Sequence, residues 1–519
     1  MGLLTIYDTT LRDGSQGEGV SFTVEDKLKI AKRLDKLGVD YIEGGWPGSN
    51  PKDVEFFERI QEVELETARI AAFSSTRRPN IKAEDDPNIR KLAEAGTGVV
   101  TIFAKSWDFH VTEALGVSLE ENLEMITDTI EFLRGEGLEV IFDAEHFFDG
   151  YKSDPEYALK TLDRAARAGS ELLVLCDTNG GMLPEDISRV MSEVQQQVET
   201  PLGIHAHNDG GMGAANSIAG YDQGAVQIQG TVGGLGERCG NADLCTVIPT
   251  LALKYGRDRL PRIDLQRLTS TYYFVMETAN HIPENRHPYV GASAFTHKGG
   301  IHVSALQKDP STYEHIEPEA VGNKRRVLVS ELSGKSNFRY KLREMGFDLE
   351  DFDKQTLSEI SSTIKEMEHE GYQFEGAEAS LELLVYKQYR DYQPFFDVED
   401  FKIISHNSGS MTSSEAVIKL EVNGEREHTV AAGDGPVNAL DNALRKALHD
   451  FYPRIKELKL IDYKVRVLNG GDGTAARVRV LIETAGKDCS WTTVGVSTNI
   501  IQASWQALVD SIEYGLLNC

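Results

Sequence analysis

Residues 3–45 read LLTIYDTTLRDGSQGEGVSFTVEDKLKIAKRLDKLGVDYIEGG. A short apolar run (3–7) is followed by a polar segment, an amphipathic pattern (24–38) and a second apolar run (39–45). Apolar residues recur every three or four positions in the amphipathic pattern, and Gly38 closes it as glycine closes many helices. The stretch therefore predicts a strand, a helix and a second strand.

The same alternation continues over the first 255 or so residues. The runs that we expect to form strands are LLTIY (3–7), VDYIEGG (39–45), ARIAAFS (68–74), VVTIFA (99–104), LEVIFDAE (138–145), ELLVLCD (171–177), LGIHAH (202–207) and AVQIQG (225–230). Eight strand–helix units in about 250 residues match the size of a (β/α)8 barrel. A doubly wound sheet also satisfies such alternation, but the count of eight favours a TIM barrel over residues 1–258.

The pattern changes beyond the predicted barrel. Helical patterns, such as TLSEISSTIKEMEHEGY, dominate from about 260 to 390, and we expect a helical connector over 259–394. Hairpin patterns return after about 395, and one turn is predicted at Asn423-Gly424, a pair typical of type I′ turns. The fold class is therefore α/β, with a C-terminal α+β domain over 395–519.

The C-terminal domain contains an internal repeat. TVAAGDGPVNALDNAL begins at Thr429 and TVGVSTNIIQASWQAL begins at Thr493, an offset of 64 residues. The match predicts a duplicated unit, although two helices with alanine-rich packing faces also produce so short a match. Because no acid–base constellation occurs there, we interpret the domain as regulatory or dimerising.

Composition limits the partners. The 519 residues are 40% apolar, which predicts a globular protein, and they include 82 acidic against 54 basic residues, a net charge of −28. Such an excess disfavours nucleic acid and anionic membrane surfaces. No apolar run reaches the roughly 18 residues of a membrane helix, and the first residues lack the pattern of a signal peptide. We expect a cytoplasmic protein.

Polar residues gather where the predicted strands end, which is where barrel enzymes carry their working residues. His205 and His207 are two apart on one strand, so both side chains leave the same face. Together with Asp13 they form a common ligand set for a divalent metal, although packed or hydrogen-bonded histidines also fit the pair. A 2-oxo acid would fill two of the remaining positions on an octahedral ion.

Three further residues at this rim, and one polar cluster in the predicted connector, are of types that take part in catalysis. The guanidinium of Arg12 suits a substrate carboxylate and a developing oxyanion, so we do not expect Asp13 to be its ion-pair partner; an ordinary pair closing the barrel top is the alternative. Glu43 and Glu145 would orient Arg12, ligate metal-bound water or transfer protons. The cluster in the connector contains His287, His297 and His302, then Tyr313. A histidine with a pKa near neutral suits removal of a proton from a thioester methyl group, while surface histidines are the alternative.

Five motifs together resemble one class of barrel enzymes. They are TTLRDGSQ (9–16), IEGGWPG (42–48), HAHND (205–209), GERCGN (236–241) and AFTHKGGIH (294–302). The class comprises the isopropylmalate, homocitrate and citramalate synthases and hydroxymethylglutaryl-CoA lyase, also known as the DRE-TIM metallolyases. The connector and the duplicated module resemble the synthase branch with its regulatory domain, so the resemblance covers nearly the whole chain.

The resemblance implies roles for individual residues. The implied metal ligands are Asp13, His205 and His207, with Asn241 near a fourth position. The implied contacts to the 2-oxo acid are Arg12, Glu145 and Thr178, with Glu43 in the Arg–Asp cluster. His302 and Tyr313 resemble the catalytic pair that reaches over the barrel mouth, and whether Glu145 or His302 is the base stays open.

Three segments, EGGWPGSNPKD (43–53), KSWDFH (105–110) and YEHIEPEAVGN (313–323), resemble the citramalate synthase group most closely. The resemblance implies condensation of acetyl-CoA with pyruvate and water to (R)-citramalate and CoA, the first step of a pyruvate route to isoleucine. It also implies a divalent metal (Mn, Mg or Zn), a homodimer and an isoleucine effector. The alternatives are a 2-isopropylmalate or homocitrate synthase and, since lyases do not need the duplicated module, less favourably a 3-hydroxyacyl-CoA lyase.

Overall fold

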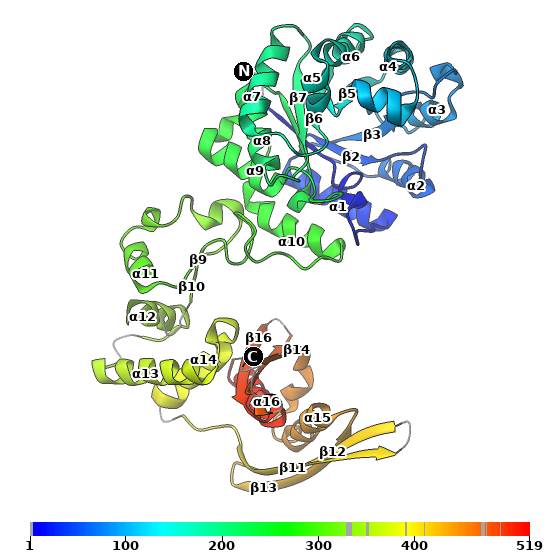
Figure 1. The fold of residues 1–519 in the computed structure, drawn as a ribbon. Coiled ribbons are helices and arrows are strands. Elements are labelled where there is room, and N and C mark those ends of the chain that lie inside the picture. Colours follow the sequence, from blue (N-terminus) through cyan, green and yellow to red (C-terminus); the bar gives the residue numbers. More distant parts are fainter. Residues whose placement is uncertain are drawn as a thin grey trace. The chain divides into compact units, whose positions relative to one another are not determined.

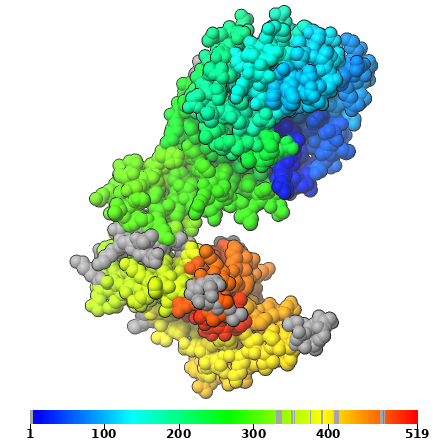
Figure 2. All heavy atoms as spheres, in the orientation of Figure 1, coloured from blue at the N-terminus to red at the C-terminus, as the bar shows by residue number. Residues whose placement is uncertain are grey.

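The structure is a computed structural model that describes residues 4–328, 335–348, 352–389, 392–408, 411–468, 473, 475–487 and 489–518. The chain divides into two compact units, residues 1–295 with 314–325 and residues 296–313 with 326–519. In the space-filling view the blue to green residues of the barrel form one continuous body (Figure 2).

A closed barrel of eight parallel strands forms the first unit (Figure 1). Its strands are β1 (Thr5–Asp8), β2 (Tyr41–Gly45), β3 (Arg69–Ser75), β4 (Val99–Lys105), β5 (Glu139–Glu145), β6 (Leu172–Asp177), β7 (Leu202–Ala206) and β8 (Gln227–Gly230). They follow the chain order around the barrel, and β8 closes it by pairing with β1. The predicted TIM barrel is confirmed, and the doubly wound sheet is excluded.

Helices surround the barrel (Figure 1). They are α1 (Val24–Leu37), α2 (Pro51–Ile60), α3 (Pro87–Ala93), α4 (Leu119–Gly135), α5 (Phe147–Ser153), α6 (Pro155–Arg167), α7 (Pro184–Gln195), α8 (Gly213–Asp222), α9 (Leu244–Thr250) and α10 (Leu268–Thr278). Glycine follows α1 in the left-handed conformation that ends many helices, with Gly38 at φ 94°.

Alternate strand residues face two different cores. Ile6, Val100 and Val140 belong to the large cluster that includes the helices. Their neighbours Tyr7 and Val99 belong to a smaller cluster made almost entirely of strand residues. Because successive side chains of a strand point to opposite faces, the smaller cluster fills the barrel interior and the larger one joins the strands to the helices.

The second unit begins with short elements and helices. These are β9 (Thr296–His297), α11 (Gly300–Leu306), β10 (Arg326–Val327), α12 (Lys335–Glu344), α13 (Lys354–Glu370) and α14 (Glu378–Tyr389). The predicted dominance of helices in this part of the chain is confirmed. An apolar cluster that includes Leu342, Ile364 and Leu381 packs the last three helices together.

Two similar sheet-and-helix units follow. The first contains β11 (Asp397–Ser408), β12 (Met411–Val422), β13 (Glu425–Gly433) and α15 (Pro436–Leu448); the second contains β14 (Lys459–Val467), β15 (Val478–Ala485), β16 (Ser490–Ser497) and α16 (Ile500–Asn518). Each sheet is antiparallel and follows the chain order. Thr429 and Thr493 lie on the third strand of their copies, so the predicted duplication and α+β character are confirmed.

The hairpin between β12 and β13 has the predicted turn. Asn423 and Gly424 have φ values of 53° and 84°, and two central residues with positive φ are the mark of a type I′ turn. This turn matches the right-handed twist of the strands it joins.

Within the described ranges, none of the helices combines the length and the apolar character that a membrane span needs.

Two glycines with the same backbone conformation allow a matched test of packing at the barrel. A Cβ on Gly38 would lie 2.0 Å from the carbonyl oxygen of Arg262, whereas a Cβ on Gly137, at φ +82°, would meet nothing within 4 Å. We expect Gly137→Ala to cost about 1–2 kcal/mol, since the left-handed conformation is strained in alanine, and Gly38→Ala to cost about 1–3 kcal/mol more through overpacking. Thermal melts of the two variants check this, and equal losses would contradict it.

Candidate active site

Three buried side chains from opposite ends of the barrel sequence meet at its rim. The ligand atoms of Asp13, His205 and His207 all lie within 4.8 Å of one another, and Asp13 Oδ2 is 3.4 Å from His205 Nε2. Asp13 follows β1, His205 lies on β7 and His207 directly follows β7. Closure of the barrel therefore brings the three predicted ligands together.

Unsatisfied atoms at this position fit a cation. Within the described residues, His207 Nδ1 and Asn241 Oδ1 are buried without a hydrogen-bond partner, which is unusual for buried polar atoms. Asn241 pairs with His207 through the backbone, and its side-chain Nδ2 donates to the carbonyl oxygen of Leu235 at 3.0 Å. The donor set of one carboxylate and two imidazoles suits a divalent metal.

The protonation of these groups also suits a cation. Burial alone would raise the pKa of Asp13, but Arg12 and His205 outweigh it and hold that pKa below its ordinary value. Burial and the neighbouring His205 lower the pKa of His207 to about 4. A carboxylate and a neutral imidazole are the forms that bind a metal.

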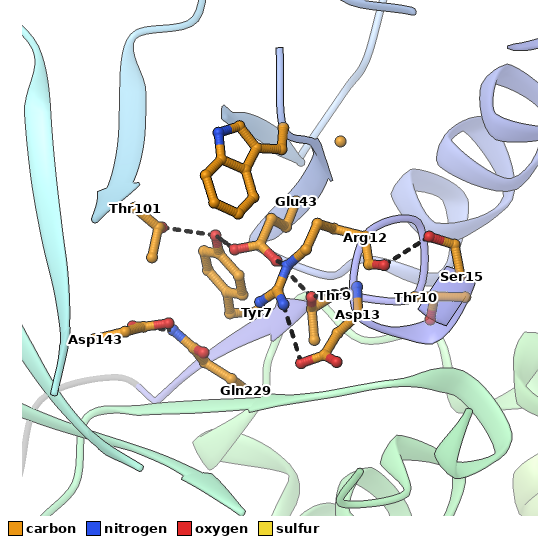
Figure 3. Close-up of polar contacts among 12 residues, drawn as sticks. Tyr7, Thr9, Thr10, Arg12, Asp13, Ser15, Glu43, Thr101, Asp143 and Gln229 are labelled. Atoms are coloured by element: carbon orange, nitrogen blue, oxygen red, sulfur yellow. Dashed lines mark hydrogen bonds and ion pairs between the residues drawn. The ribbon is translucent and has the colours of Figure 1, made fainter. Parts of the chain in front are cut away.

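Arg12 is held by two carboxylates (Figure 3). Its Nε lies 2.5 Å from Glu43 Oε2, and its Nη1 lies 3.3 Å from Asp13 Oδ2. The expectation that Asp13 is not an ion-pair partner of Arg12 is therefore wrong. The two residues are adjacent on the loop that leaves β1, and this loop turns back so that both side chains face the rim.

Glu43 anchors this arrangement. The carboxylate is fully buried and accepts hydrogen bonds from Tyr7 Oη at 2.7 Å and Thr9 Oγ1 at 2.5 Å, besides the bond from Arg12 (Figure 3). Tyr7 Oη also lies 2.7 Å from Thr101 Oγ1. The sequence left three roles open for Glu43: orienting Arg12, ligating metal-bound water and transferring protons. The observed contacts fit the first role, orienting Arg12.

A cavity of about 190 Å³ opens beside these groups. Its lining includes all of Arg12, Asp13, Glu145, Thr178, His205 and His207. Glu145 forms an ion pair with Lys105 at 2.5 Å. Thr178 Oγ1 accepts a bond from the backbone N–H of His146 at 2.8 Å, which leaves the hydroxyl hydrogen of Thr178 to donate elsewhere.

One wall of the cavity is aromatic. Phe73 and Phe103 stack with ring centroids 5.2 Å apart, and Trp46 meets each of them edge-on at 5.8 Å. The guanidinium carbon of Arg12 lies 3.8 Å from the centroid of Phe73. Sequence reasoning did not single out these rings, because aromatic residues at strand ends are also typical of a core.

His302 and Tyr313 belong to the second unit. Their rings stack on each other with centroids 4.1 Å apart and an interplanar angle of 28°. Both side chains are exposed. The structure thus pairs the two residues that the resemblance assigned to one catalytic pair.

Three family models together match most of the chain. The model of the HMGL-like family matches residues 4–275, that of the homocitrate synthase post-HMGL domain-like family matches residues 289–372, and that of the LeuA allosteric (dimerisation) domain matches residues 375–516. The first match spans the barrel and every predicted metal ligand.

Several relatives that match nearly the full length of the chain are named (R)-citramalate synthase. An (R)-citramalate synthase of Geobacter sulfurreducens is 55% identical over 99% of this chain and 98% of that protein. One of Aquifex aeolicus is 53% identical over 99% of this chain and 97% of that protein. A probable 2-isopropylmalate synthase of Methanopyrus kandleri is 33% identical over 98% of this chain. On these matches, the chain belongs to the HMGL-like family of barrel enzymes.

Proposed function

We propose that the chain is an acyltransferase that condenses acetyl-CoA with pyruvate and water to (R)-citramalate and CoA. The main observation behind this proposal is that Arg12, Asp13, His205 and His207 all line one cavity. Relatives that are 55% and 53% identical over nearly their whole length are named (R)-citramalate synthase, which supports this product over that of the isopropylmalate or homocitrate synthases. Its place would be the first step of a pyruvate route to isoleucine.

Asp13, His205 and His207 would hold a divalent cation (Mn, Mg or Zn), with Asn241 beside them. When bound, such a cation polarises a keto group and stabilises negative charge on its oxygen. The buried, unpartnered atoms of His207 and Asn241 support this assignment. A 2-oxo acid offers two oxygens in the geometry that the open side of such a centre accepts.

The remaining residues of the cavity would bind and orient pyruvate. Arg12, fixed by Glu43, donates to the substrate carboxylate and to the oxyanion that develops from the ketone. Thr178 donates its free hydroxyl hydrogen to the carboxylate. Glu145, held by Lys105, lines the same cavity and completes the polar side of the oxo-acid site.

Proton transfer is assigned to His302 with Tyr313. His302 would remove a proton from the acetyl methyl group of acetyl-CoA, and the resulting carbon nucleophile would attack the ketone carbon of pyruvate. Hydrolysis of the thioester by water then releases CoA and makes the condensation irreversible. The stacked, exposed rings of His302 and Tyr313 support their action as a pair.

The C-terminal module would form a homodimer and bind isoleucine as an effector. Five β-branched residues of its sheets are exposed: Ile404, Val430, Ile461, Val465 and Val467. Such apolar sheet surface is typical of protein interfaces, and the family model that matches the module is named for allostery and dimerisation.

The proposal also assigns a role to each part of the chain. Residues 1–258 would form the catalytic domain, 259–394 the linker that contributes catalytic residues, and 395–519 the regulatory domain. The family matches divide the chain in the same order but at other positions, with ends at 275, 372 and 516. A cytoplasmic location stays a prediction that suits an enzyme of central metabolites.

The reaction itself is the first test. We expect the purified chain to release CoA thiol from acetyl-CoA when pyruvate is present, because the cavity offers both a cation centre and a carboxylate site. The rate should fall to background after chelation and return with Mn, Mg or Zn, as measured with a thiol reagent. A higher kcat/KM with 2-oxoisovalerate or 2-oxoglutarate than with pyruvate would overturn the substrate assignment.

The base is tested by isotope exchange at the acetyl methyl group. In His302→Ala we expect exchange to fall by about 10²–10⁴-fold, the usual contribution of a general base. Glu145→Ala should retain exchange while losing condensation, since Glu145 is assigned to pyruvate. Mass spectrometry of acetyl-CoA in deuterated buffer measures both. Undiminished exchange in His302→Ala would remove that residue from the role.

The aromatic wall is tested by changing the size of the oxo acid. Because Phe103 stacks on Phe73 at the cavity, Phe103→Ala should make room for a branched side chain. We expect the ratio of kcat/KM for 2-oxoisovalerate to that for pyruvate to rise by about 10-fold or more, the scale of one or two methylene groups. Phe109→Ala is the matched control, since Phe109 is 53% exposed and does not line the cavity. An unchanged ratio in Phe103→Ala would contradict this use of the wall.

A further inference from the structure

Gln229 is a fully buried amide inside the barrel, next to the candidate metal centre. It lies on β8 directly opposite His205 of β7, where the two residues are register partners. Its Oε1 is 2.9 Å from His205 Nδ1. The contact is thus built into the strand pairing and does not depend on a loop.

The orientation of this amide follows from its other neighbours. Gln229 Nε2 lies 3.1 Å from Asp143 Oδ1 and 3.4 Å from Gln227 Oε1, both of which accept from it (Figure 3 shows the contact with Asp143). Two acceptors on the nitrogen side leave the oxygen of the amide facing His205. An amide oxygen only accepts hydrogen bonds, so His205 Nδ1 must carry a proton.

The consequence appears on the opposite side of the imidazole ring. A neutral imidazole protonated at Nδ1 has its lone pair at Nε2, and Nε2 is the atom that lies 3.4 Å from Asp13 Oδ2. The ring is therefore held in the tautomer and direction that a metal ligand needs.

We propose that Gln229, oriented by Asp143, is a positioning residue that fixes the tautomer and orientation of His205 for metal binding. This inference rests on the proposed metal centre. An amide suits the position better than a carboxylate, because Glu43 and Asp13 already place negative charge beside Arg12 at the rim. The neutral amide orients the imidazole without adding a further buried charge.

Metal binding is the direct test, and it needs no turnover. We would titrate metal-free protein with Mn²⁺ and follow free Mn²⁺ by electron paramagnetic resonance. Gln229→Met, which keeps the length of the side chain, should weaken binding by about 10- to 100-fold, as loss of a ligand's orienting partner usually does. Gln227→Met is the matched control: it removes a buried amide of the same strand that does not bond His205. Because the closer acceptor, Asp143 Oδ1 at 3.1 Å, still orients Gln229 in this variant, it should bind Mn²⁺ within about threefold of the natural protein.

Two results of the titration would overturn the inference. One is Mn²⁺ affinity in Gln229→Met equal to that of the natural protein; the other is an equal loss in both variants, which would indicate general packing. The His207→Ala variant distinguishes a failure of this inference from a failure of the proposed metal centre. If the natural protein binds Mn²⁺ no more tightly than His207→Ala does, the proposed metal centre fails; if it binds more tightly and Gln229→Met matches it, only the role of Gln229 fails.

A second measurement does not depend on the folding of any Gln229 variant. Nitrogen chemical shifts of metal-free protein labelled at its 13 histidines distinguish a protonated ring nitrogen from one with a lone pair, and loss of one signal set in His205→Gln assigns His205. We expect a protonated Nδ1 and an unprotonated Nε2. The opposite tautomer would overturn the inference whatever the outcome of the titration.

Discussion

The guanidinium of Arg12 and the carboxylate of Glu43 lie 2.5 Å apart at the barrel rim, where both are largely shielded from water. Burying two charges costs several kcal/mol per ion, which their attraction offsets only when further hydrogen bonds satisfy the remaining atoms. Tyr7 and Thr9 supply those bonds to Glu43. Arg12 is therefore already oriented before any substrate arrives, and a preorganised donor is the kind that stabilises a developing oxyanion most effectively.

This ion pair is part of a polar layer inside an otherwise apolar barrel. Burial raises the pKa of Tyr7 and of Asp143 well above their ordinary values, so both groups favour their uncharged forms. Their hydrogen bonds, to Glu43 and Thr101 for Tyr7 and to Gln229 for Asp143, limit the cost of burying them. The fold tolerates such a layer because the larger core between strands and helices supplies most of the apolar burial.

Sequence patterns were sufficient for the barrel and for the meeting of Asp13 with His205 and His207, because closure of eight parallel strands brings all strand ends to one rim. They were not sufficient for the partners of Arg12. Whether the guanidinium of Arg12 contacts Asp13, Glu43 or both depends on its rotamer and on the path of the loop. Neither of these leaves a periodic signal in the sequence. Gln229 was missed for a related reason: its bond to His205 follows from the register between two strands, and a run such as AVQIQG does not reveal register.

The C-terminal module connects its two copies through one core. Leu440 and Leu444 of α15 belong to the same apolar cluster as Leu508 and Ile512 of α16, so the helices of the two copies share one core. Each sheet uses one face for this core and leaves β-branched residues exposed elsewhere. This shared core is a contiguous path through which a change in packing in one copy can reach the second copy. Coupling between two distant sites of a domain is carried by contiguous packing of this kind.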